Sequence, residues 1–175
     1  MNADQLRRLQ LPHKERYRDD PAAARQTLVA EGTLEIDRVA CRVATAAGPV
    51  LAGLHPAAGG DGSFACPGDM LLQALAGCAG VTLAAVATAL QIPVRGGTVR
   101  AEGVMDFRGT LGVTKDAAVG FEEIRLVFDL DTDATTEQLD NLLRLTRRYC
   151  VVYQTLVKSP RLAETMEIRT TANRR

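Results

Sequence analysis

The stretch GDMLLQALAGCAGVTLAAVATAL, residues 68–90, carries no charge after Asp69 and predicts the longest helix of the protein. Pro93 follows shortly afterwards and cannot continue a helix. The charge-free run extends from Met70 to Val94, which is long enough to raise the question of a membrane span. Alanine, glycine and threonine dominate this run, and they contribute little to membrane insertion. We therefore expect a central helix that is covered by other parts of the protein.

The composition restricts the class of protein. The chain has 175 residues, of which 46% are hydrophobic, so it is long enough for one domain with a substantial core. Its 21 basic and 21 acidic residues give a net charge of zero, and it contains no Trp. These values remove the electrostatic and stacking arguments for a nucleic-acid or membrane partner. Residues 1–20 lack an apolar signal core, so we expect a cytoplasmic protein with reduced thiols.

The remaining sequence predicts strands and helices in separate groups. Alternating apolar residues predict six strands, at residues 27–36, 39–44, 50–54, 97–107, 119–130 and 162–170, with a further short piece near Leu111. A capping pattern at Thr135 predicts a second helix up to Tyr149, and residues 151–157 predict a short third one. Strands grouped apart from helices predict an α+β fold with a mainly antiparallel sheet rather than a doubly wound one.

Two segments that contain cysteine form a pair of motifs. Residues 67–78 read PGDMLLQALAGC, and residues 150–156 read CVVYQTL. The first resembles the helix motif of the OsmC/Ohr superfamily, Pro-x-Glu-Leu-Leu followed by Ala-Leu-x-Gly-Cys. The second is similar to that superfamily's Cys-Pro-Val-x-x-Thr-Leu signature, and the order of elements between the two motifs also fits. From Thr27 onward the chain therefore resembles the OsmC-like branch of this superfamily.

The resemblance implies a fold, an assembly and a division of the chain. The expected fold is OsmC-like, with a long buried central helix in an intertwined homodimer whose active sites lie near the subunit interface. Residues 27–175 would form a single OsmC-like domain. Residues 1–26 would form an N-terminal helical arm, interrupted at Pro12 and Pro21.

The resemblance also implies an activity, the thiol-dependent reduction of organic hydroperoxides. By position, Cys78 would attack the peroxide and become a sulfenic acid, and Cys150 would condense with it to a disulfide. An external dithiol would then reset the pair, and we expect no cofactor. A wall of apolar side chains would favour organic hydroperoxides over hydrogen peroxide; it would comprise Leu75, Val81, Val151, Val152 and Tyr153.

Cys78 needs help to become a thiolate. It lies about ten residues inside its helix, too far to benefit from the helix N-terminus, so a cation is expected to reach it. Members of the superfamily use an arginine there, and the candidates in this chain are Arg16, Arg18, Arg38, Arg42, Arg147 and Arg148. Asp69 falls on the opposite side of the helix, roughly 13 Å along its axis. We expect Asp69 to complement the helix dipole or to hold an arginine.

Departures from the superfamily pattern keep other interpretations open. The proline after the second cysteine is Val151, and the acidic position after the motif proline is Gly68. One alternative is that both cysteines are inert core residues, because free cysteine is among the most buried residue types. Another is a non-catalytic, stress-associated OsmC-like protein that binds a small apolar ligand at the dimer interface. A zinc site is disfavoured because no cysteine pair has the spacing of a zinc knuckle.

Overall fold

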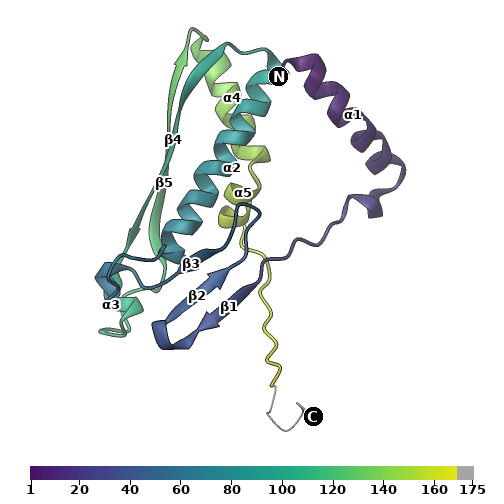
Figure 1. The fold of residues 1–175 in the computed structure, drawn as a ribbon. Helices are drawn as coiled ribbons and strands as arrows, with labels where there is room; N and C mark the ends of the chain where they lie inside the picture. Colours follow the sequence, from purple (N-terminus) through teal and green to yellow (C-terminus); the bar gives the residue numbers. More distant parts are fainter. Residues whose placement is uncertain (169–175) are drawn as a thin grey trace.

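The computed structural model describes residues 1–168 and is organised around one long helix (Figure 1). A two-stranded sheet of β4 (Val94–Met105) and β5 (Phe121–Thr132) lies along this helix. A separate three-stranded sheet has the order β1 (Gly32–Glu35), β2 (Ala40–Val43), β3 (Val50–Ala52). All named strand pairs are antiparallel. The α+β class expected from the sequence is therefore confirmed.

The central helix, α2 (Pro67–Leu90), begins and ends where its sequence predicts. Pro67 occupies its first turn, where a missing N–H costs nothing, and Asp69 complements the helix dipole there. The helix ends at Gln91 in the left-handed conformation, with φ 55°, and the Ile92 N–H closes the end by donating to the Ala87 carbonyl at 2.9 Å. One face is buried along its length, and its residues are Leu75, Ala79, Leu83 and Ala87.

The opposite face of α2 is open in a single chain, where Val81 is 74% exposed. Among the described residues, α2 is also the one helix long and apolar enough to cross a membrane. The central helix of a soluble fold meets the same criterion of length and composition. Because α2 packs against β4, α4 (Thr136–Tyr149) and α5 (Val151–Val157), its apolar composition is explained by its place in this fold.

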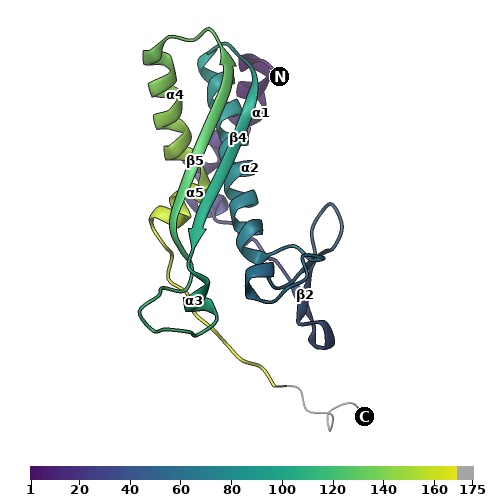
Figure 2. The ribbon, with the colours of Figure 1, turned by 90° about the vertical axis from the view of Figure 1, so that its left-hand side faces the viewer.

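The β4–β5 hairpin presents one apolar and one charged face. Val99 pairs with Phe128 and Ala101 with Leu126, and these pairs alternate with pairs that contain a charged residue, such as Arg100 with Val127 and Glu102 with Arg125. Figure 2 shows this hairpin running beside α2 and α4. Below the apolar face lies the main core, where Leu83, Ala87, Ile92 and Leu142 are buried together and are flanked by Val86, Val94, Phe128, Leu130, Ala134 and Leu139.

The C-terminal helices meet at a single residue. Thr135 and Gln138 form a capping box that starts α4, as the sequence predicts. The helix ends at Cys150, which is also the N-cap of α5. One cysteine therefore fixes the junction between two helices.

The N-terminal segment differs from the expectation at Pro12. Helix α1 (Ala3–Asp19) continues through Pro12, because a proline inside a helix removes one hydrogen bond and bends the helix without necessarily ending it. Asn2 and Gln5 form a capping box at its start, and the short turn η1 (Pro21–Ala24) follows. The two further turns of this kind, η2 (Ile36–Arg38) and η3 (Pro56–Ala58), flank β2 and β3. The boundary between an arm and a domain at residues 26 and 27 stays a prediction.

Two expected strands are wrong. The piece near Leu111 is replaced by the helical turn α3 (Phe107–Thr110), because the Asp106 carboxylate accepts a hydrogen bond from the Arg108 N–H at 2.9 Å and caps it. Residues 162–168 of the expected strand at 162–170 form no strand, and the rest of that strand lies outside the described residues. The tail leaves the body of the chain (Figure 1), so it has no neighbouring strand with which to pair.

Candidate active site

Cys78 and Cys150 meet between the middle of α2 and the start of α5. Cys78 is half-buried on α2, whereas Cys150 is only 1% exposed. Each thiol shifts the pKa of the other, and both are free rather than joined in a disulfide. The fold thus brings together two cysteines that are remote in the chain, as the paired motifs predict.

The α4–α5 junction fixes the position of Cys150. Its backbone N–H donates to the Thr146 carbonyl at 2.9 Å, and its sulfur accepts a hydrogen bond from the Tyr153 N–H at 3.5 Å. The Gln154 side chain ties the two helices together by donating to the Arg147 carbonyl at 2.7 Å. Cys150 therefore occupies a junction that hydrogen bonds from both helices hold in place.

The surroundings of Cys78 favour its ionised form. Burial raises the pKa of the Cys78 thiol, but hydrogen bonds to the sulfur outweigh this effect and hold the pKa below its ordinary value. The donors, in decreasing order of effect, are the Val152 N–H, the Cys150 thiol, the Val151 N–H and the Thr82 hydroxyl. The two backbone donors belong to the first turn of α5, whose N–H groups have no partner inside the helix.

Cys150 has the opposite tendency. Burial raises its pKa, the Tyr153 N–H lowers it, and the neighbouring Cys78 raises it further, through the hydrogen bond and through its charge. The net direction is upward. The pKa values of the pair are therefore shifted in opposite directions, which favours ionisation of Cys78 over ionisation of Cys150.

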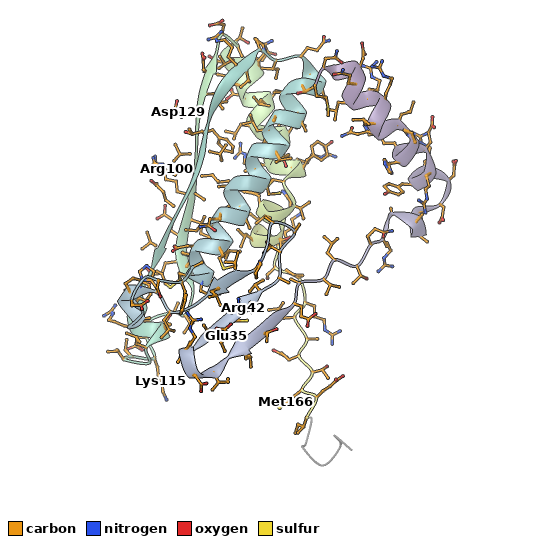
Figure 3. The ribbon with its side chains drawn as sticks, in the orientation of Figure 1. Glu35, Arg42, Arg100, Lys115, Asp129 and Met166 are labelled. Atoms are coloured by element: carbon orange, nitrogen blue, oxygen red, sulfur yellow. The ribbon has the colours of Figure 1, made fainter. Side chains whose placement is uncertain are left out.

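The arginines expected near Cys78 lie elsewhere in the single chain. Arg38 and Arg42 both pair with Glu35 on the N-terminal sheet, the former at 3.1 Å, and Figure 3 shows Glu35 and Arg42 on that sheet. Arg147 lies in the last turn of α4 with an exposed side chain. Asp69 is exposed in the first turn of α2. Of the expected site residues, the structure brings together only the two cysteines.

Three donors to the sulfur of Cys78 are absent from the sequence-based expectation. Thr82 lies four residues after Cys78, so the two residues share a face of α2, and this spacing could have identified it. The N–H groups of Val151 and Val152 are backbone atoms that no side-chain pattern displays. The expected short helix at residues 151–157 was the available signal, since a helix start presents free N–H groups.

An apolar cavity of about 530 Å³ lies beside the cysteine pair. Its walls include Leu75, one turn before Cys78, and Tyr153, whose N–H donates to Cys150. The expected apolar wall is only partly formed in one chain, because Val81 is 74% exposed and Val151 is 69% exposed. Neither cysteine lines this cavity, but Leu75 and Tyr153 connect it to the helices that carry them.

The other two cysteines line a different cavity. Cys41 lies on β2 and Cys66 is the N-cap of α2, and both are half-buried. They border an apolar cavity of about 690 Å³ between the three-stranded sheet and the α3 region. These residues take no part in the hydrogen bonds of the Cys78–Cys150 pair.

The chain is thus an α+β protein with a pair of thiols. One cysteine lies on the central helix, and the other lies at the start of a later helix. The family model described as OsmC-like protein matches residues 60–165, which include α2, both cysteines and the β4–β5 hairpin. The chain belongs to the OsmC-like branch of the OsmC superfamily. No curated protein matches the chain by sequence.

Solved structures share this fold at low identity. An OsmC-like protein from Mycoplasma pneumoniae is 16% identical with a TM-score of 0.64, covering 77% of this chain and 89% of its own. An organic hydroperoxide resistance protein from Elizabethkingia anophelis is 17% identical with a TM-score of 0.60, covering 77% and 90%. One from Bacillus subtilis is 18% identical with a TM-score of 0.55, covering 75% and 93%. At these identities the likeness establishes the fold alone.

Proposed function

We propose that the protein is a thiol-dependent peroxidase that reduces organic hydroperoxides through Cys78 and Cys150. The observation that carries this proposal is the contact between a thiol with a lowered pKa and a buried thiol with a raised pKa. A thiolate is the form of cysteine that attacks a peroxide, and a neutral thiol beside it is placed to form a disulfide. Two inert core cysteines would not need pKa values that are shifted in opposite directions.

The reaction has three balanced steps. The Cys78 thiolate attacks the distal peroxide oxygen, so a sulfur–oxygen bond forms and the oxygen–oxygen bond breaks. The product is a Cys78 sulfenic acid, and the alkoxide leaves as an alcohol after taking a proton from solvent. The Cys150 thiol condenses with the sulfenic acid to give a disulfide and water. An external dithiol then reduces this disulfide and is itself oxidised, which restores both thiols.

The cavity beside the pair supports an organic substrate. The cavity of about 530 Å³ is bordered mainly by apolar side chains from α2, β5 and α5, together with Glu122 and Glu123, and its apolar part favours the organic portion of a hydroperoxide over a small polar peroxide. Structural neighbours named organic hydroperoxide resistance proteins agree with this substrate class.

A homodimer is part of the proposal. In one chain the outer face of α2 is open at Val81, and apolar side chains on the three-stranded sheet are also exposed, as Leu34 is at 71%. Large apolar side chains exposed on both elements are consistent with a surface that a partner covers. A second copy that covers α2 would also bring a second set of arginines to the site, so Arg38, Arg42 and Arg147 stay candidates for the cation beside Cys78. A cytoplasmic location, in which dithiols stay reduced, completes the proposal.

One observation favours a second candidate function. The apolar cavity of about 690 Å³ has a volume typical of small-molecule sites and lies away from the Cys78–Cys150 pair. A stress-associated protein that binds an apolar ligand without turnover would retain such a cavity.

The experiment that separates the two functions is the consumption of cumene hydroperoxide with a dithiol reductant. We expect turnover by the wild type, none by Cys78→Ser, and a single oxidation without turnover by Cys150→Ser. Activity that survives Cys78→Ser would exclude Cys78 as the nucleophile. A wild type that is inactive with several dithiols would favour the ligand-binding function.

A further inference from the structure

The apolar cavity of about 690 Å³ is bordered by a histidine that its neighbours hold in a fixed orientation, His55. Its Nδ1 accepts a hydrogen bond from the Ala57 N–H at 3.0 Å, and its backbone carbonyl accepts from the N–H groups of Ala58 and Gly60 at 2.8 and 3.0 Å. Its ring stacks on that of Phe107, with the ring centroids 4.8 Å apart. Contacts from two segments of the chain therefore fix the position of this imidazole.

These contacts also decide which nitrogen of His55 can donate a hydrogen bond. Because Nδ1 accepts the Ala57 N–H, the neutral imidazole carries its proton on Nε2. Within residues 1–168, the structure contains no hydrogen bond from this Nε2. The side chain is half-buried, and a donor that has lost part of its contact with water gains from an acceptor. His55 therefore offers one hydrogen-bond donor to a molecule in the cavity.

The charged groups around the cavity are already paired with each other. Glu35 borders the cavity, and its carboxylate accepts hydrogen bonds from both Arg38 and Arg42. Arg38 also acts electrostatically on Asp61, so two acidic residues balance two basic ones. At the start of α2, which forms another part of the wall, Asp69 complements the helix dipole. No surplus charge is therefore left to bind an ionic ligand.

We propose that this cavity binds an uncharged, largely apolar molecule with one hydrogen-bond acceptor, such as a ketone, and that His55 donates to the acceptor through Nε2. The volume is typical of small-molecule sites, which combine apolar walls with a few fixed polar groups. The apolar wall includes Ile36, Ala52, Leu54 and Met105. This inference rests on the ligand-binding function, which it deepens by naming the ligand class, and it does not require peroxidase activity.

The test uses the full wild-type chain and three probes of similar size. Acetophenone has an uncharged acceptor, ethylbenzene has none, and benzoate has a charged one. Cys41 and Cys66 border the cavity, so an occupant should slow their alkylation by iodoacetamide, followed for each cysteine by mass spectrometry. We expect acetophenone to protect these two cysteines at a lower concentration than ethylbenzene or benzoate. The alkylation rates of Cys78 and Cys150, which do not border this cavity, should stay unchanged.

The role of His55 is tested by His55→Phe, which keeps an aromatic ring against Phe107 and removes the donor. The concentration of acetophenone that gives half-protection should rise about two- to twelvefold, the effect of losing one hydrogen bond, whereas that of ethylbenzene should not change. His13→Phe is the matched control, because His13 lies exposed on α1 and does not border the cavity. If ethylbenzene no longer protects His55→Phe, the substitution has disturbed the cavity, and the three probes on the wild type decide.

Equal protection by acetophenone and ethylbenzene, or stronger protection by benzoate, overturns the inference about the ligand class. Protection that extends equally to Cys78 and Cys150 overturns the assignment to this cavity. Cys41 and Cys66 that resist alkylation without any probe, because a second copy of the chain covers them, overturn it too. The assay contains no peroxide, so its outcome is independent of turnover. A wild type that reduces cumene hydroperoxide and shows no protection defeats this inference and leaves the peroxidase proposal standing, and an inactive wild type with selective protection gives the reverse result.

Discussion

Replacing Cys150 by alanine should destabilise the protein, whereas replacing it by serine should not. Alanine removes the acceptor for the Tyr153 N–H at the N-cap of α5, and such a loss costs about 0.5–2 kcal/mol. Cys150 is 1% exposed, so removing its sulfur also forfeits about 1 kcal/mol of buried contact. We expect Cys150→Ala to lower the free energy of unfolding by about 1.5–3 kcal/mol. Serine restores the cap acceptor and most of the volume.

The assay is urea unfolding of wild type, Cys150→Ala and Cys150→Ser under reducing conditions, so that no disulfide contributes to stability. Both variants lack the resolving thiol, so a difference between them reports on the cap and on the packing at the α4–α5 junction. An alanine variant that unfolds at the same urea concentration as the serine variant would refute the assigned role of the sulfur. It would also remove the reason for α5 to start beside Cys78.

Three further predictions follow from separate features. Because alkylation requires the thiolate and the pKa of Cys78 is lowered, the alkylation rate of Cys78 should reach its midpoint at a pH below the value of about 8.5 for free cysteine. The midpoint for Cys150 should lie above that value, because its pKa is raised. Equal midpoints would contradict the opposite shifts of the two pKa values. Leu142→Ala, at a residue 1% exposed in the main core, should cost about 2–5 kcal/mol in thermal or urea unfolding, and a loss under about 1 kcal/mol would contradict the core assignment. Gly97→Ala should be strongly destabilising in the same assay, because Gly97 has φ +154° and an added Cβ would lie 2.3 Å from the Asp129 carbonyl oxygen. Gly96→Ala, with open space around its Cβ, is the matched control, and equal losses at the two positions would contradict this reading of the hairpin.

The elements that local sequence signals determine could be predicted. Pro67 and Pro93 bracket α2, and Thr135 with Gln138 starts α4, because caps and prolines act on the residues next to them. Strand limits were less predictable. Residues 27–30 were expected in the first strand, but β2 ends at Val43, which pairs with Gly32, so they have no ladder partner. Residues 162–168 were likewise expected in a strand, and they have no neighbouring strand with which to pair.

In the candidate site, too, some features could be predicted from the sequence and others depend on how the chain folds. The cysteine pair was predictable because the two segments that contain it resemble the paired motifs of a known superfamily. The groups that lower the pKa of Cys78 were not, because two of them are backbone N–H groups of a helix start. Arginines were expected beside the Cys78 thiol because a cation there would favour the thiolate. In one chain, however, Glu35 pairs with both Arg38 and Arg42, and sequence does not reveal which opposite charge a guanidinium will meet.

The most direct measurement of the central claim is a map of the disulfide formed when the reduced protein, with Cys41 and Cys66 replaced by serine, receives one equivalent of cumene hydroperoxide and no dithiol. The peptides that contain Cys78 and Cys150 should be recovered joined to each other, in an amount that matches the peroxide consumed. Recovery of Cys78 as a sulfinic or sulfonic acid with Cys150 still a free thiol would contradict the account.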